Sequence, residues 1–124
     1  MKISTKRGDK GVTQVLGLGR VSKDHPMVEY LGTVDELQSL LGMLPESEDI
    51  DRIQTDLYTL MCGEAIEPWF DTDIPEQTEF ILPKGIWHVA RTVCRRAERR
   101  AVEAGVNCIY LNRLSDWLYK QAIL

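Results

Sequence analysis

The sequence predicts an all-α fold, an up-and-down bundle of four helices in a single domain that spans residues 1–124. Apolar residues recur at spacings of three and four in four segments, which is the period of an amphipathic helix. Proline or glycine separates these segments. No segment shows the alternation typical of a strand, because the apolar residues before Pro83 are too few to form one.

The N-terminal segment, residues 1–26, is expected to be an irregular arm, since it holds four glycines, Pro26 and only short apolar stretches. The helix bundle is expected to occupy residues 27–124. We expect its first helix to start near Met27, with Asp24 as the cap and Pro26 in the first turn, and to end at Pro45.

The other three helices follow from the same pattern. A second helix is expected from about Ile50 to Ala65, followed by a loop or broken turn over residues 68–75. A third helix is expected from Ile86 to Ala104, where Gly105 provides a C-cap. A last helix is expected from Val106 onward.

Composition excludes several classes of protein. Hydrophobic residues make up 44% of the chain and charged residues 27%, which is typical of a folded globular protein rather than a disordered one. No apolar run is long enough to span a membrane. The first ten residues are too polar for a signal peptide, so we expect a cytoplasmic location. Cys62, Cys94 and Cys108 are expected to be reduced thiols in or near the core, not disulfide or zinc ligands.

Charge is distributed unevenly along the chain. Six lysines or arginines but only one acid, Asp9, lie in residues 1–23, and eleven acids lie between Glu46 and Glu79. Five arginines then fall within residues 91–100. Two basic blocks around an acidic one indicate an anionic ligand gathered between the basic blocks, and argue against a uniform nucleic-acid surface.

The third helix carries these five arginines in rows. Arg91, Arg95 and Arg99 are spaced to stack on one face, while Arg96 and Arg100 form a neighbouring row, with Glu98 within reach of Arg95. The rows could bind a polyphosphate or carboxylate. Alternatively, they form a solvated face balanced by the acids of residues 46–79. A third row, Val89, Val93 and Ala97, is expected to face the core, which favours a binding site because the arginine rows then border the core.

The arm has two interpretations as well. Residues 5–14, TKRGDKGVTQ, combine hydroxyls, lysines and glycines, the ingredients of an anion cradle, although the P-loop pattern is absent. The alternative is a flexible basic terminus.

Four segments together resemble a known family. They are TKRGDKGVTQ with RVSKDHP, YLGTVDEL, FILPKG followed by HVARTVCRRAERRAV, and YLNRLSDWLY. In this order they resemble the ATP:cob(I)alamin adenosyltransferases of the propanediol-utilisation type. The resemblance implies a ferritin-like bundle of four to five helices, assembled as a homotrimer with active sites between subunits.

The implied reaction transfers the 5′-deoxyadenosyl group of ATP to cob(I)alamin or another reduced corrinoid and releases triphosphate, with Mg²⁺ as a cofactor. Cobalt(I) is the nucleophile, so no protein nucleophile is needed, and lysines, arginines and a divalent cation would stabilise the leaving triphosphate. The resemblance implies no protein-held metal, and His88 is expected in the core or beside a ligand-binding residue. A cobalamin reductase or an adenosylcobalamin-dependent enzyme is a candidate partner; a nucleic acid or a membrane is not.

The resemblance also assigns roles to particular residues. Arg91, Arg95, Asp35 and Phe80 would be catalytic, with Asp35 paired to Arg91 across the interface and Phe80 against the lower face of the corrin. The residues implied to bind the nucleotide are Thr5, Lys6, Arg7, Gly8, Thr13, Gln14, Lys23, Arg95, Arg96, Glu98, Arg99 and Asn112.

This chain departs from the family pattern in several places, which include a shorter connection between Gly105 and Cys108 and an early end of the last helix at Leu124. It is shortened between residue 65 and FILP, so that one family helix is largely missing. Lys84 stands where the family usually has a second glycine, about five residues are missing before HVAR, and Arg7 stands where the family often has Thr or Ser. Two other functions are therefore considered: a non-catalytic ATP- or corrinoid-binding module or corrinoid delivery protein, and a nucleic-acid binder that uses residues 91–100.

Overall fold

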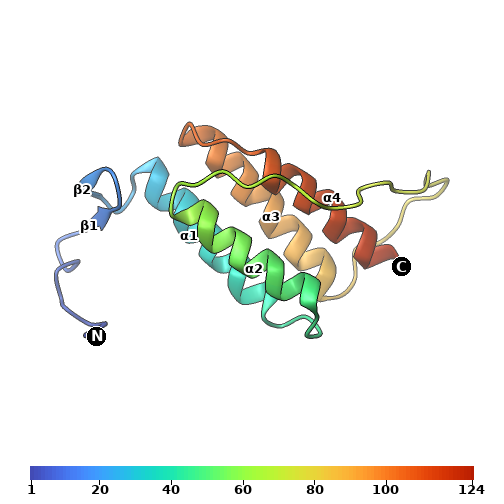
Figure 1. Ribbon diagram of the computed structural model, residues 1–124, viewed down its shortest axis with the longest axis horizontal. Coiled ribbons are helices and arrows are strands. Elements are labelled where there is room, and N and C mark those ends of the chain that lie inside the picture. The colour runs from blue at the N-terminus through green and yellow to red at the C-terminus, as the bar shows by residue number, and fades with distance from the viewer.

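Four helices and a small hairpin make up the computed structural model, which describes residues 1–124 (Figure 1). The elements are, in order, β1 (Val12–Val15), β2 (Gly19–Ser22), α1 (Pro26–Leu41), α2 (Glu48–Met61), α3 (Ile86–Glu103) and α4 (Ile109–Ile123). The prediction of a four-helix bundle is confirmed. The prediction of a wholly irregular arm is wrong, because residues 12–22 form an antiparallel hairpin.

The core lies between the helices, where α3 packs against both α1 and α4, and α1 also packs against α2. The side of α3 that enters the core is a stripe of small residues, Ala90, Cys94, Ala97 and Ala101, all fully buried. Small side chains allow neighbouring helices to approach closely. Of the row expected to face the core, Ala97 is fully buried and Val93 packs against the core, but the prediction is wrong for Val89, which is 46% exposed while Ala90 is buried.

The hairpin pairs Val12 with Ser22 and Val15 with Gly19. Gly17 and Gly19 have φ angles of 85° and 78°, a left-handed conformation that glycine adopts at little cost. Val15 is buried, so the hairpin is attached to the bundle by an apolar contact as well as by the chain. The nucleotide-binding candidates Thr13 and Gln14 thus lie on an ordered strand.

Side chains and turns set the helix ends differently from the sequence prediction. The imidazole Nδ1 of His25, not Asp24, caps α1 by accepting from the Met27 N–H at 3.0 Å. Gly63, with a φ of 90°, follows the end of α2, which is therefore shorter than expected. The Asn107 Oδ1 accepts from the Ile109 N–H at 2.8 Å and fixes the start of α4.

The connection between α2 and α3, residues 62–85, contains neither helix nor strand. Figure 1 shows it crossing the bundle and then projecting beyond the end opposite the N terminus. The Trp69 indole N–H donates to the Asp56 carboxylate at 2.9 Å, and the Tyr110 hydroxyl donates to the same oxygen at 2.8 Å. Lys120 pairs with Asp71 at 2.9 Å. The first half of the connection is thus attached to α2 and α4.

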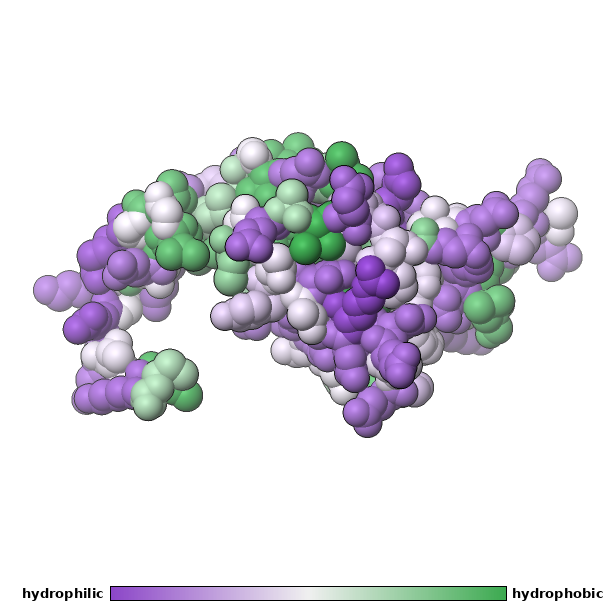
Figure 2. Space-filling view, in the orientation of Figure 1, coloured by the Kyte–Doolittle hydropathy of each residue, from purple (hydrophilic) through white to green (hydrophobic).

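The surface in Figure 2 is hydrophilic over α2 and apolar in separate patches. One patch covers the hairpin, where Leu16 and Leu18 are exposed, and another covers the end of the bundle where α3 meets α4, with Val102 and Ile109 exposed. None of the helices combines the length and the apolar composition that crossing a membrane requires.

Candidate functional site

Basic residues of the N-terminal arm are gathered by the hairpin. The Lys23 ammonium lies over Gly8, where a Cβ atom would come within 2.9 Å of Nζ. The Arg20 guanidinium lies 3.5 Å from the Arg7 carbonyl oxygen, to which it donates. Two of the predicted nucleotide-binding residues, Gly8 and Lys23, therefore lie side by side, and a side chain at residue 8 would displace the end of the lysine.

The backbone of the arm is partly committed to its own turns. The Asp9 N–H donates to the Lys6 carbonyl, the Gly11 N–H to the Gly8 carbonyl, and the Arg7 N–H to the Thr5 hydroxyl. Because these amides already have partners, an anion at the arm would be held mainly by lysine and arginine side chains. The expected cradle of backbone amides is thus less open than the glycines suggest.

Asp35 connects two clefts along α1. One, of about 370 Å³, lies between the hairpin and α1 and is lined by Thr13, Gln14 and Asp35. The other, of about 390 Å³, lies between α1 and α3 and is lined by Asp35, Glu36 and Val93 among others. Asp35 itself is exposed and forms no ion pair within the chain. The structure therefore brings three predicted site residues, Thr13, Gln14 and Asp35, to one cleft.

The two arginine rows of α3 differ in their partners. In one row, Arg95 and Arg99 are exposed and pair with no carboxylate. In the other row, Arg96 pairs with Glu36 of α1, and Arg100 pairs with Glu103 at 3.0 Å. Glu98, expected within reach of Arg95, forms no ion pair with it.

The acids of residues 46–79 do not balance these arginines. The only one of them that forms an ion pair is Asp71, and its partner is Lys120 on α4. None of these acids forms an ion pair with an arginine of α3, so the acidic segment does not neutralise the arginine row by direct contact. Arg95 and Arg99 are exposed on α3, while Ala90, Cys94, Ala97 and Ala101 of the same helix pack into the core.

Arg91 begins this positive row and lies partly inside the bundle. Its guanidinium lies 5.7 Å from the centre of the Tyr119 ring, and its buried Nε has no hydrogen-bond partner. His88, one turn earlier, is buried as expected; its ring packs edge-on against Tyr119, and its Nδ1 also has no partner.

Asn112 lies on α4 beside the arginine helix. The Cys94 thiol of α3 donates to the Leu111 carbonyl oxygen at 3.2 Å, which ties the two helices together next to Asn112. Burial raises the pKa of the Cys94 thiol, so it stays protonated and can donate. Asn112 itself is exposed, and its side chain is free to contact a ligand.

Phe80 lies apart from the other candidates. It is on the projecting part of the 62–85 connection, and 86% of it is exposed. Its neighbour Leu82 is exposed as well. None of the four main clefts of the single chain is lined by Phe80.

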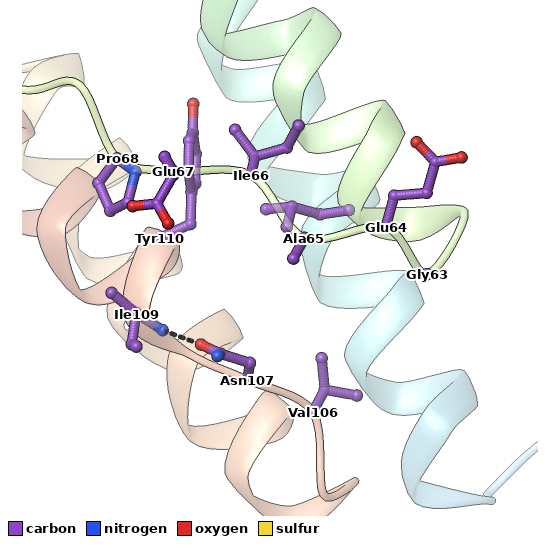
Figure 3. Close-up of a pocket in the computed structure, with 11 residues that line it drawn as sticks. Gly63, Glu64, Ala65, Ile66, Glu67, Pro68, Val106, Asn107, Ile109 and Tyr110 are labelled. Carbon is purple, nitrogen blue, oxygen red and sulfur yellow. Dashed lines mark hydrogen bonds between the residues drawn. The ribbon is translucent and has the colours of Figure 1, made fainter.

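A further cleft, of about 410 Å³, lies where α4 begins (Figure 3). In Figure 3, residues 63–68 pass from the end of α2 toward Tyr110, and Asn107 caps α4 on the opposite side. None of the predicted site residues lines this cleft. Sequence reasoning also missed Glu36 and Tyr119, whose contacts with the arginines depend on how the helices pack.

Comparison with known proteins decides the family. The cobalamin adenosyltransferase family model matches residues 3–68 and 61–124, which is nearly the whole chain. The chain belongs to the cobalamin adenosyltransferase family. The two matched segments meet at residues 61–68, so the family residues that this chain lacks belong after α2, where the 62–85 connection begins.

Relatives within the cobalamin adenosyltransferase family are similar over most of their length. The corrinoid adenosyltransferase of Bacillus subtilis is 36% identical, and the match covers 98% of this chain and 85% of that protein. The bovine corrinoid adenosyltransferase is 34% identical over 98% of this chain and 70% of the relative. A variant of the PduO-type ATP:corrinoid adenosyltransferase from Lactobacillus reuteri, in complex with cobalamin and ATP, superimposes with a TM-score of 0.80 at 30% identity, covering 98% of this chain and 91% of that one.

Proposed function

We propose that this chain transfers the 5′-deoxyadenosyl group of ATP to a reduced corrinoid and releases triphosphate. The observation that carries the proposal is the unpaired row of Arg95 and Arg99 on the exposed face of a core helix, in a member of the cobalamin adenosyltransferase family. The solved relative holds both cobalamin and ATP. Uncompensated guanidinium groups on a rigid element suit the binding of a polyphosphate.

The reaction requires charge stabilisation more than acid–base chemistry. The cobalt(I) electron pair attacks the ribose 5′ carbon, a cobalt–carbon bond forms, and the carbon–oxygen bond to the triphosphate breaks. The departing oxygen keeps the electron pair of that bond. Arg95, Arg96 and Arg99, with Lys6, Arg7 and Lys23 from the arm, would stabilise the negative charge on the triphosphate.

Polar residues next to these cationic side chains would orient the nucleotide. Thr13 and Gln14 line the cleft next to α1, and Asn112 lies beside the arginine helix. Thr5, Gly8 and Glu98 complete the proposed nucleotide set. Holding ATP in one orientation lowers the barrier because the ribose carbon is already in line with cobalt.

The active site would lie between two copies of the chain in a homotrimer. In one chain, none of the four main clefts is lined by both the basic arm and the Arg95 row. Arg91 has an unpartnered Nε, and Asp35 is an exposed carboxylate without an ion pair. Pairing Asp35 of one copy with Arg91 of the next would satisfy both and bring an arm to an arginine row. Sedimentation equilibrium, with a trimer expected, tests this assembly.

Phe80 is proposed to pack against the lower face of the corrin. Its aromatic ring is exposed and has no role within the chain's own core. An apolar ring beneath cobalt would exclude water from the axial position, which makes reduction of cobalt(II) to cobalt(I) easier. A cobalamin reductase would supply the electron, and an adenosylcobalamin-dependent enzyme would accept the product. We propose that both partners share a cytoplasmic location with this chain.

Magnesium would enter with the nucleotide. No three His, Cys, Asp or Glu side chains are grouped so that they could hold a metal ion, so the chain's own residues do not fit a protein-held Mg²⁺ site. Mg²⁺ commonly binds phosphate oxygens of a substrate and keeps several waters. A magnesium titration of activity at fixed ATP tests this proposal.

One assay separates the candidate functions. The protein is mixed with cob(I)alamin, ATP and Mg²⁺, and adenosylcobalamin and triphosphate are measured together; equal amounts of both are expected. Binding of ATP without release of triphosphate would favour a non-catalytic module or a delivery protein. The nucleic-acid alternative predicts steeply salt-dependent binding to DNA or RNA, which we do not expect.

A further inference from the structure

One ion pair joins the arginine helix to α1. Arg96 of α3 donates through Nη2 to the Glu36 carboxylate, and this is the only ion pair between these two helices. Both side chains remain partly exposed, 39% for Arg96 and 56% for Glu36. The pair therefore lies at the surface, at the rim of the cleft between α1 and α3.

Glu36 can affect an anion at Arg96 in two opposite ways. It can compete with the anion for the guanidinium, or it can hold the guanidinium in place for the anion. Arginine has five N–H donors in a fixed plane, and the structure shows a single bond from Nη2 to Glu36. The Nε and Nη1 donors remain available, which favours the second possibility.

Fixing a long side chain before the ligand arrives makes binding stronger. A free arginine loses rotamer freedom when it contacts a phosphate, and that loss weakens binding. Arg96 is already fixed, whereas the neighbouring Arg95 and Arg99 have no carboxylate partner. The helix thus presents two arginines without a carboxylate partner beside one that has a partner.

We propose that Glu36 is a positioning residue for the nucleotide: it holds Arg96 so that the remaining guanidinium donors face the triphosphate of ATP. This inference rests on the proposed function. Glu36 acts through Arg96 and does not itself touch the substrate.

The test compares Glu36→Gln with Glu103→Gln, which removes the other carboxylate that pairs with an arginine of α3. For Glu36→Gln we expect the KM and the Kd for ATP to rise about fivefold, equivalent to about 1 kcal/mol. The kcat should fall as well, because Arg96 also stabilises the departing triphosphate in the proposed reaction, whereas the KM for cob(I)alamin should stay within about twofold of the wild type. Glu103→Gln should leave all four values unchanged.

A double-mutant comparison shows whether Glu36 acts through Arg96. In an Arg96→Ala background, Glu36→Gln should have no further effect on the Kd for ATP. A purely structural role would instead lower helical circular dichroism and raise the KM of both substrates. Glu36→Asp keeps the charge but places the carboxylate farther from Arg96, so it should give an intermediate Kd for ATP. It also serves as the test if Glu36→Gln does not fold.

The outcomes separate this inference from the proposed function. Tighter ATP binding by Glu36→Gln would mean that Glu36 competes with ATP, and an unchanged Kd would mean that it does not position Arg96; either result overturns the inference. A wild-type chain that binds ATP but forms no adenosylcobalamin overturns the proposed function, while the Kd comparison still decides the role of Glu36. A wild-type chain that binds no ATP overturns both.

Discussion

Replacing Asp56 by alanine should detach the 62–85 connection from the bundle and destabilise the protein by about 3 kcal/mol. One Asp56 oxygen accepts from both the Trp69 indole and the Tyr110 hydroxyl, at 2.9 and 2.8 Å. Each hydrogen bond to a charged group contributes about 1.5–3 kcal/mol, and we take the lower value because Asp56 is partly exposed. The Tyr110 ring is 2% exposed, so its hydroxyl would be left without a partner.

Urea unfolding followed by circular dichroism and by tryptophan fluorescence measures this change. Trp69→Phe and Tyr110→Phe each remove one bond and should each cost about 1–1.5 kcal/mol. Adding Tyr110→Phe to Asp56→Ala should cost little, because the unpartnered hydroxyl is then gone. A loss below about 1 kcal/mol for Asp56→Ala, or full additivity of the double variant, would refute the view that this carboxylate anchors the connection.

Three further predictions follow from the site and from burial. Arg95→Ala should abolish adenosylcobalamin formation and leave helical circular dichroism unchanged, because Arg95 is exposed; unchanged turnover would remove this arginine from the mechanism. Phe80→Ala should slow formation of adenosylcobalamin without weakening ATP binding or stability, since the ring packs on nothing in the chain; a changed Kd for ATP would contradict this. Burial raises the pKa of Cys94 and Tyr110 from ordinary values of 9.0 and 10.0, so above pH 9 the unfolded chain loses protons that the folded chain keeps. The free energy of unfolding should therefore be highest below pH 9 and fall above it, by up to about 1.4 kcal/mol per pH unit for each group. In urea titrations at several pH values, Cys94→Ala should make this fall less steep.

The helices could be predicted from the sequence because their apolar spacing and their bounding prolines and glycines are local features. The phase of α3 could not. The prediction placed Val89, Val93 and Ala97 toward the core; Val93 and Ala97 do pack there, but the stripe is centred on Ala90, Cys94 and Ala97, because close helix packing favours small side chains. The hairpin was missed because each strand is only four residues long and carries little apolar alternation.

The candidate site was predictable in its residues but not in its partners. The resemblance to a family supplies residue types at positions along the chain, and it led to the arginines and the arm. That Glu36 pairs with Arg96, and that Asp71 pairs with Lys120 rather than with an arginine, depends on side chains brought together across helices. Contacts between copies of the chain depend on assembly and stay predictions.

The small-residue stripe on α3 has a consequence for how this enzyme could change. The alanines and the cysteine of this stripe are fully buried where α3 packs against α1 and α4. The helix that carries the guanidinium groups therefore has no free space on its buried side. A bulkier residue in this stripe would displace α3 and move its guanidinium groups. Substitutions in the stripe are therefore a poor route to a change in ligand preference. Substitutions and changes in length are easier to accommodate in the hairpin and in the 62–85 connection. The connection is also where this chain is shorter than its relatives.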